Sequence, residues 1–292
     1  MQLGVTFPQT EIGADVGGVR AYAEAAEGLG YDYVLAYDHV LGAEVRSRPE
    51  WKPTGARAIP YTHADMFHEP LTLFAYLAGV TKRLRMATGV LVLGQRQTAL
   101  VAKQAAEVDV LSGGRLRLGV GLGWNDVEYE SLGMDFHTRG RRVEEQVAAL
   151  RALWTQEVVT FKGRWHTITA AGINPLPVQR PIPIWFGGTS EQAYKRAARL
   201  GDGFFFIGDA KRLAATVAQV RGWVTEAGRD VAGFGMEGSV QYREGEMERV
   251  RAEVEGWRAL GASHVTVQTM RAGLQGAAAH IKAITQAKAA IG

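Results

Sequence analysis

A histidine that could act as an acid or a base follows an apolar run near the start of the chain. The run covers residues 33–36, and Tyr37, Asp38 and His39 come directly after it. An imidazole group exchanges protons near neutral pH, so His39 could donate a proton to a substrate. The alternative is a structural histidine at the base of the long segment that follows.

Two glycine-containing segments end or interrupt apolar runs, and either could lie against a flat ligand. Gly89 and Val90 stand inside the run at 84–93. Gly121, Gly123 and Trp124 close the run at 116–121. A glycine inside a strand often marks a bulge or a close approach of the backbone to a ligand. Packing within the protein is the alternative, and Trp124 breaks the spacing of the dinucleotide fingerprint G-x-G-x-x-G.

A further segment could bind a phosphate group. Gly187, Gly188, Thr189 and Ser190 follow the apolar run at 182–186 and precede a helical pattern at 191–200. The first N–H groups of a helix have no acceptor within the helix, and they attract phosphate oxygens. An ordinary Ser or Thr cap after a glycine turn is the alternative.

The composition argues against several other kinds of site. The chain has no cysteine, which excludes disulfides, thiolate metal sites and a cysteine nucleophile. His63, Asp65, His68 and Glu69 lie close together, but their spacing fits no standard zinc pattern, so we expect no metal site. The net charge is +3 and the basic residues are scattered, so we expect no nucleic-acid partner.

The sequence also has no pattern typical of a membrane or exported protein. The first residues lack the basic and apolar regions of a signal peptide. The sequence contains no apolar run of about 18 residues, the length that a membrane-spanning helix needs. We therefore expect no membrane association and a cytoplasmic location.

These segments need a scaffold that brings them together, and the order of the apolar runs predicts one. Strand patterns cover residues 3–7, 33–36, 84–93, 116–121, 182–186, 203–207, 234–241 and 265–268, and a helical pattern follows each. Such alternation implies parallel strands with right-handed crossovers. The eight pairs predict an α/β fold, a (β/α)8 TIM barrel, with an open doubly wound sheet as the alternative. Catalytic groups of a barrel lie at the carboxyl ends of its strands.

Two segments are longer than ordinary connections in such a barrel. Residues 38–68 contain three prolines, Trp51 and Tyr61, and we interpret them as a lid over the barrel mouth; a structural or oligomer-packing insertion is the alternative. Residues 157–181 contain a hairpin pattern at 158–161 and 165–168. We expect one domain over residues 1–292, and we expect Thr98 to cap the helix after the third strand.

Together these motifs resemble those of the luciferase-like monooxygenases. The resemblance rests on TGVLVL at 88–93, AKQAA at 102–106, VDVLSGGR at 108–115, GVGLGW at 119–124 and EY at 128–129. It continues at PIWFGG (183–188) and GDGF (201–204), so it covers nearly the whole chain. The sequence is most similar to the branch of probable oxidoreductases that depend on the deazaflavin coenzyme F420.

The resemblance implies a (β/α)8 barrel with an insertion region and a flavin-type cofactor. Deazaflavin-binding relatives carry a non-proline cis peptide at the third strand, and the matching bond is Gly89–Val90. The ring would lie against this bond, with Gly121 to Trp124 along one edge. The phosphate would lie at Gly187 to Ser190, and His39 matches a catalytic or ring-facing histidine of some relatives. Sugar-phosphate dehydrogenases of the family have a glutamate where Trp124 stands, so we expect another substrate.

The resemblance leaves the cofactor open between coenzyme F420 and FMN. F420 has carbon where FMN has the reactive nitrogen N5, so it passes hydride and does not readily activate oxygen. We expect F420 and hydride transfer to or from a small-molecule substrate. FMN-dependent monooxygenation, with a flavin reductase as partner, is the alternative, and a non-catalytic flavin-binding barrel is a third.

Two further expectations concern the lid and the assembly. The polyglutamate tail of F420 would favour basic residues at the rim of the pocket. The lid supplies Arg46, Arg48, Lys52 and Arg57, although a solvated lid face accounts for them equally well. A homodimer is expected from the resemblance and from the frequency of such dimers.

Overall fold

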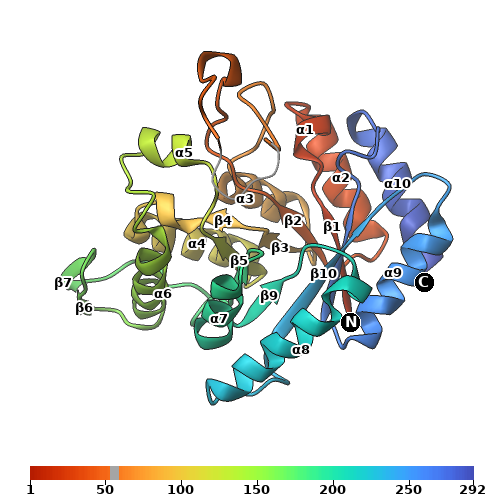
Figure 1. Ribbon diagram of the computed structural model, residues 1–292. Coiled ribbons are helices and arrows are strands. Elements are labelled where there is room, and N and C mark those ends of the chain that lie inside the picture. The colour runs from red at the N-terminus through yellow and green to blue at the C-terminus, as the bar shows by residue number, and fades with distance from the viewer. Residues whose placement is uncertain (53–58) are drawn as a thin grey trace.

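A closed parallel barrel forms the centre of the computed structural model, which describes residues 1–52 and 59–292 (Figure 1). The barrel strands are β1 (Gln2–Thr6), β2 (Tyr33–Ala36), β3 (Arg85–Thr88), β4 (Leu91–Val92), β5 (Leu116–Gly121), β8 (Ile184–Gly187), β9 (Gly203–Phe205), β10 (Gly235–Gln241) and β11 (His264–Gln268). They follow one another around the ring in chain order, and the pairing of β3 with β5 closes it. Because β3 and β4 are halves of one strand, the described residues form the predicted (β/α)8 barrel and not an open sheet.

Helices surround the barrel (Figure 1). They are α1 (Gln9–Ile12), α2 (Val16–Gly28), α3 (Pro70–Val80), α4 (Thr98–Ser112), α5 (Asp126–Ser131), α6 (Arg139–Thr155), α7 (Glu191–Leu200), α8 (Ala210–Glu226), α9 (Met247–Ala259) and α10 (Gly276–Ile291). Short acidic side chains begin two of the long ones: Asp15 accepts from the N–H of Gly18, and Asp209 from that of Arg212. Within the described residues, no helix is long and apolar enough to cross a bilayer.

Both sides of the barrel strands are buried, which explains their continuous apolar runs. Successive side chains of a strand point to opposite sides. Val34 and Ala36 of β2 therefore pack in the layer between strands and helices, while their neighbours point into the barrel. The cluster inside the barrel consists of Tyr33, Leu35, Ala87, Trp185 and Phe205.

The third barrel strand is not continuous over residues 84–93, as the apolar run predicted. β3 ends at Thr88, the Gly89–Val90 peptide is cis, and β4 is only two residues long. A 3-10 turn then covers Leu93–Gln95. The cis bond lies where the family resemblance placed it, and the apolar run continued through the break because these residues stay largely buried.

The predicted cap of α4 was wrong. The N-cap position is Gln97, and its side chain makes no capping hydrogen bond. Thr98 is the first helical residue, and its hydroxyl bonds instead to the imidazole Nε2 of His166 at 2.7 Å. It also accepts a hydrogen bond from the amide of Gln146. A contact with a residue 68 positions away along the chain therefore replaces the local cap.

The predicted hairpin is confirmed, with its strands shifted along the chain. β6 (Val159–Lys162) pairs antiparallel with β7 (Thr167–Ala171). The carboxylate of Glu145 on α6 holds the turn, because it accepts hydrogen bonds from the backbone N–H groups of Arg164, Trp165 and His166. This hairpin projects beside α6, away from the barrel axis (Figure 1).

Gly119 faces the neighbouring backbone so closely that a larger residue does not fit. A Cβ there would lie 1.9 Å from the carbonyl oxygen of Thr88. We predict that Gly119→Ala lowers the free energy of unfolding by about 1–3 kcal/mol or more, because neighbouring strands must move apart. Urea unfolding followed by circular dichroism measures the change.

Gly79→Ala is the matched control for this prediction. Gly79 lies on α3 with no atom within 4 Å of the added Cβ, so alanine should raise the stability by up to about 1 kcal/mol. Equal unfolding midpoints for the two variants would contradict the close contact between β3 and β5.

Candidate active site

A cleft opens at the carboxyl ends of the barrel strands, where barrel enzymes carry their active sites. Its larger cavity has a volume of about 430 Å³ and its smaller one about 140 Å³. The two are adjacent, because they share the lining residues Tyr37, Gly89, Val90, Ile207 and Gln268. The larger cavity is also lined by Asp38, His39, Pro60, Tyr61, Phe67, Val92, Gly123, Trp124, Met270 and Arg271.

The Gly89–Val90 peptide forms part of the wall between the two cavities. Gly89 lies against β2, and a Cβ there would be 2.4 Å from the Leu35 side chain. The hydroxyl of Thr88 donates to the carbonyl of Gly119 at 2.6 Å, which ties the end of β3 to β5. The bulge is therefore held from both neighbouring strands, as a support for a flat ligand requires.

The glycine at position 121 serves the packing of Val90. A Cβ at Gly121 would be 2.3 Å from Val90 Cγ2, and one at Gly187 would be 2.7 Å from Val90 Cγ1. Gly121 lines neither cavity. The sequence left two functions open for Gly121, contact with a cofactor ring and packing within the protein. In the structure, Gly121 makes room for the Val90 side chain.

Aromatic side chains from the lid and from the segment after β5 form one wall of the larger cavity. Trp124 contacts Tyr61, with ring centroids 5.3 Å apart, and Trp51, at 6.2 Å. Gly123 has φ +66, a conformation that glycine adopts without strain, and it lets the chain turn so that Trp124 faces the lid. The indole N–H of Trp51 donates to Asp126 at 2.7 Å, which attaches the lid to α5.

His39 lies in this wall, as predicted from its position after β2. Its ring stacks on Tyr61 at a centroid distance of 3.7 Å and contacts the edge of Phe67 at 4.8 Å. Its Nδ1 atom is buried and lies 3.6 Å from a carboxylate oxygen of Glu128, beyond hydrogen-bond distance, and it has no hydrogen-bond partner among the described residues. The opposite ring nitrogen, Nε2, is therefore the one available to a ligand.

Glu128 belongs to the motifs of the family resemblance, but the sequence indicated no role for it in the site. It is 1% exposed, and its carboxylate accepts hydrogen bonds from the N–H groups of Val40 at 2.7 Å and Leu41 at 3.3 Å. It therefore fixes the backbone on the carboxyl side of His39 as well as facing the imidazole. Glu128 and Val40 are 88 positions apart, and no local pattern indicates this contact.

A second buried carboxylate, that of Asp38, fixes the backbone on the amino side of His39. It accepts from the N–H of Val92 at 2.8 Å and from the Arg96 guanidinium at 2.7 Å. Burial raises the pKa of Asp38, and the charge of Arg96 acts in the opposite direction. Arg96 also pairs with Glu69 at 3.0 Å, so it joins the segment after β2 to the start of α3.

The candidate phosphate-binding segment, residues 187–190, lies partly in the cleft and partly on the surface. Gly187 and Gly188 line the smaller cavity, whereas Thr189 and Ser190 are exposed and line neither cavity. The Ser190 hydroxyl accepts from the N–H of Ala193 at 3.2 Å and caps α7, which leaves its own proton free to donate. Both the cap and the ligand-binding interpretations are thus compatible with this geometry.

The acidic and histidine residues of the lid have structural contacts of their own. His68 Nε2 lies 3.0 Å from the carbonyl of Gly13, and Asp65 accepts from the N–H of Thr62. Within residues 1–52 and 59–292, no group of three His, Cys, Asp or Glu side chains could hold a metal ion. Of the four basic lid residues, Arg48 lies 3.6 Å from Glu130, and Arg57 lies outside the described residues.

We predict that Asp38→Asn lowers the free energy of unfolding by about 3 kcal/mol, because it leaves the buried side of Arg96 without its counter-charge. Glu69→Gln is the matched control. Glu69 pairs with the same guanidinium, but its side chain is 35% exposed, so its loss should cost less than about 1 kcal/mol. Urea unfolding compares the two, and a Glu69 variant as unstable as the Asp38 variant would contradict this ranking.

Comparisons with known proteins agree with this geometry. The family model of the luciferase-like monooxygenases matches residues 1–290. An uncharacterised protein of Mycobacterium tuberculosis is 36% identical over 208 residues, which cover 71% of each chain. An FMNH(2)-dependent dimethylsulfone monooxygenase of Pseudomonas putida is 31% identical over 207 residues, covering 69% of this chain and 52% of that one.

A solved structure has a similar fold. It is an F420-dependent secondary alcohol dehydrogenase in complex with an F420–acetone adduct. The TM-score is 0.77 at 18% sequence identity, with 100% of this chain and 99% of that chain covered. With a family match over nearly its whole length and a barrel broken at the third strand, the chain belongs to the luciferase-like monooxygenases, a family of flavin- or F420-dependent oxidoreductases.

Proposed function

We propose that this protein is a coenzyme F420-dependent oxidoreductase that transfers hydride between the cofactor and a small carbonyl or alcohol substrate. The observation that carries the proposal is the placement of His39. Its Nδ1 faces the buried carboxylate of Glu128, and its ring borders a cavity beside Gly89–Val90. A carbonyl reduction needs a hydride and a proton, and this arrangement supplies the proton donor.

The residues of the cleft fit a flat ring with a phosphate at one end. Gly89 and Val90 present backbone to both cavities, so a ring could lie along them without meeting a long side chain. The smaller cavity ends at Gly187 and Gly188, next to the amino end of α7. Free N–H groups there, together with the Ser190 hydroxyl, would hold the phosphate.

The chemistry divides between the cofactor and the chain. Coenzyme F420, when bound, supplies or accepts the hydride. His39 would donate a proton from Nε2 to the carbonyl oxygen during reduction and recover it during alcohol oxidation. Glu128 would hold the ring so that Nε2 faces the cavity, acting as a positioning residue.

Tyr37 lines both cavities and also carries a proton, but its hydroxyl is a poorer proton donor than His39. Burial raises the pKa of its hydroxyl to about 12. The hydroxyl donates its proton to the side chain of Gln268, so it is already engaged. His39 therefore remains the better candidate for proton transfer.

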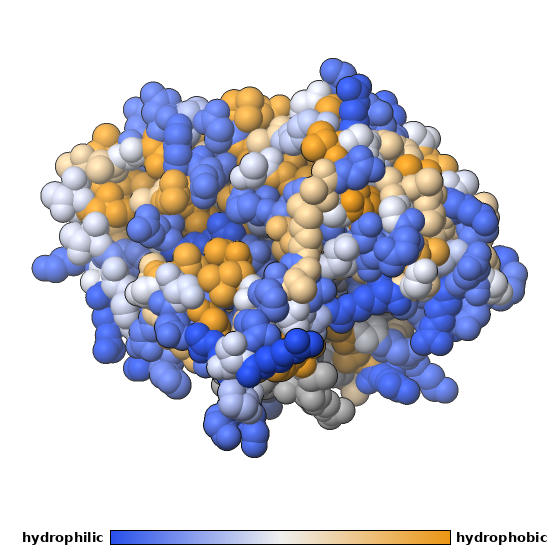
Figure 2. All heavy atoms as spheres, turned by 90° about the horizontal axis from the view of Figure 1, so that it is seen from above, coloured by the Kyte–Doolittle hydropathy of each residue, from blue (hydrophilic) through white to orange (hydrophobic). Residues whose placement is uncertain are grey.

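The substrate end of the cleft favours an apolar molecule. Phe67, Met270 and Ile207 line the larger cavity, and Ile207 is 69% exposed at its rim. Seen from above, this face of the molecule carries hydrophobic patches among hydrophilic ones (Figure 2). An exposed isoleucine beside an aromatic wall suits a small ketone or secondary alcohol with apolar substituents.

FMN-dependent monooxygenation is the second candidate function. It is supported by the 31% sequence identity with the FMNH(2)-dependent enzyme of Pseudomonas putida. FMN would present to this cleft the same tricyclic ring and first phosphate as coenzyme F420. An enzyme of that kind would require a flavin reductase as partner.

We predict that the purified protein binds coenzyme F420 in preference to FMN. Ring fluorescence measures this in two separate titrations, one with each cofactor. Preferential F420 binding supports hydride transfer, and tight binding of FMN alone assigns the protein to the monooxygenases. Absence of binding by either cofactor would contradict both candidate functions.

We predict that His39→Ala lowers the rate of acetone reduction by reduced F420 about 10²–10⁴-fold, the usual contribution of a general acid. The affinity for F420 should change little, because the proposed ring contacts come from backbone. His63→Ala, an exposed histidine of the same lid, is the control and should keep the parent rate. Parent-like turnover by the His39 variant would remove this residue from the mechanism.

A further inference from the structure

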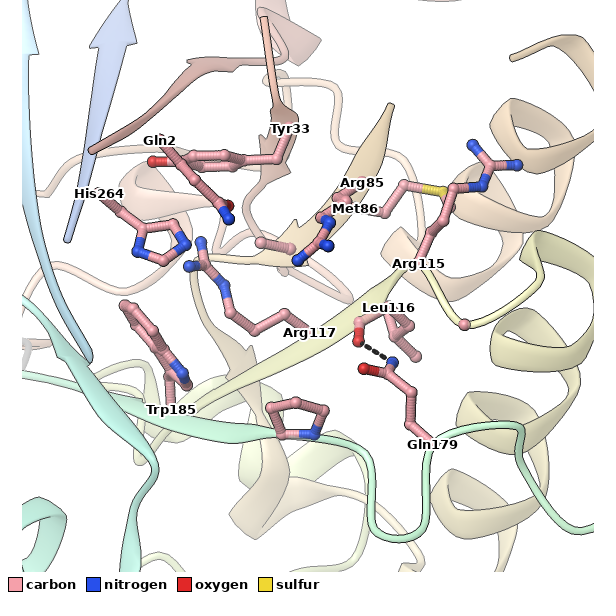
Figure 3. Close-up of a pocket in the computed structure, with 13 residues that line it drawn as sticks. Gln2, Tyr33, Arg85, Met86, Arg115, Leu116, Arg117, Gln179, Trp185 and His264 are labelled. Carbon is pink, nitrogen blue, oxygen red and sulfur yellow. Dashed lines mark hydrogen bonds between the residues drawn. The ribbon is translucent and has the colours of Figure 1, made fainter. Parts of the chain in front are cut away.

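A separate cavity lies at the opposite end of the barrel from the cofactor cleft (Figure 3). Its volume is about 170 Å³. It is bordered by the first residues of four strands: Gln2 of β1, Tyr33 of β2, Arg85 of β3 and His264 of β11. The amino ends of the strands therefore surround it, and it shares no lining residue with the cleft above.

Arg117 of β5 brings a positive charge to this cavity on a side chain that is 12% exposed. Its guanidinium carbon lies 4.1 Å from the centre of the Trp185 ring and 4.8 Å from that of Tyr33, so aromatic faces hold it on two sides. Nη2 pairs with the carboxylate of Glu237. Nη1 is buried and has no hydrogen-bond partner, which leaves one charged donor unsatisfied.

Arg85 brings a second positive charge. It is exposed, and it forms no salt bridge with the rest of the described chain. Figure 3 shows its guanidinium, the guanidinium of Arg117 and the amide of Gln2 directed into the same space. Two like charges that converge without a carboxylate between them favour an anion there.

Burial and these positive charges both affect the pKa of His264. Burial lowers the pKa of its imidazole to about 3, and the charges of Arg117 and Arg85 contribute in the same direction. The histidine is therefore neutral at physiological pH. Among the described residues, no aspartate or glutamate lines the cavity, and Glu237 lies on the far side of Arg117, where it lines the cofactor cleft.

We propose that this cavity binds a small anion, a phosphate or a carboxylate, between Arg85 and Arg117. Its oxygen atoms would satisfy Nη1 of Arg117 and accept from the amide of Gln2. A water molecule could accept one of these hydrogen bonds, but it could not balance the charge of Arg85, which has no carboxylate partner among the described residues, whereas Arg117 already pairs with Glu237. A volume of about 170 Å³ is large enough for a small anion.

The position of Arg117 gives such a site a consequence for the cleft. Glu237 faces the cofactor cleft and is fully buried, and it depends on Arg117 for its counter-charge. A bound anion would share the same guanidinium with Glu237. An anion bound at the amino ends of the strands would therefore change the electrostatic environment of Glu237, which lines the cleft at their carboxyl ends.

Isothermal titration calorimetry tests the site, with inorganic phosphate and acetate in separate titrations at low chloride. We expect saturable binding of at least one anion by the parent protein. Arg85→Gln should weaken this binding at least tenfold. Arg83→Gln, an exposed arginine two residues earlier that does not line the cavity, should leave it within twofold of the parent value.

A second readout separates this site from the proposed phosphate end of the cofactor cleft, which inorganic phosphate could also occupy. His264 lines the cavity, so a bound anion should shift its C2–H resonance in the ¹H NMR spectrum, while the resonance of the exposed His63 stays in place. Absence of saturable binding, parent-like binding by Arg85→Gln, or an unmoved His264 resonance at saturation would each overturn the proposal.

Discussion

The shape of the cleft depends on one packing constraint: the side chain of Val90 packs between β5 and β8. Its side chain occupies the space that a Cβ would take at Gly121 of β5 and at Gly187 of β8. A side chain at either glycine would displace Val90, and with it the Gly89–Val90 backbone that borders both cavities. Because barrel interiors are close-packed, neighbouring strands could not absorb this shift locally. The wall of the cleft and its glycine pattern therefore form one unit.

Two buried carboxylates complete the cleft from the lid side. Asp38 holds the chain on one side of His39 through the N–H of Val92 and the Arg96 guanidinium, and Glu128 holds the other side through the N–H groups of Val40 and Leu41. Each carboxylate accepts charge-assisted hydrogen bonds, which are stronger than neutral ones. His39 is thus fixed by its backbone on both sides, although it lies at the start of a long insertion.

The sequence predicted the barrel and the region of the site because both follow from local patterns. Apolar runs alternate with helical periods, and the ends of parallel strands meet at one face. It did not reveal the reason for Gly121, because its neighbour Val90 lies on another strand. It placed a cap at Thr98, where a distant histidine competes for the hydroxyl. It named Glu128 only as part of the family resemblance and missed its role, because the contact of Glu128 with the lid joins segments 88 positions apart. Long-range pairs of this kind leave no periodic signal.

The pair of Arg117 and Glu237 inside the barrel requires an explanation beyond stability. Removing two charges from water costs several kcal/mol for each ion, and apolar residues of similar volume often stabilise a core as well or better. Here the carboxylate also accepts from Thr266, and the guanidinium rests on Trp185, so the pair is well supported but still leaves Nη1 of Arg117 unsatisfied. A purely structural pair would gain by satisfying that donor within the chain. The proposed anion would supply the missing acceptor for Nη1, and the pair would then connect the cavity at the amino ends of the strands with the cleft at their carboxyl ends.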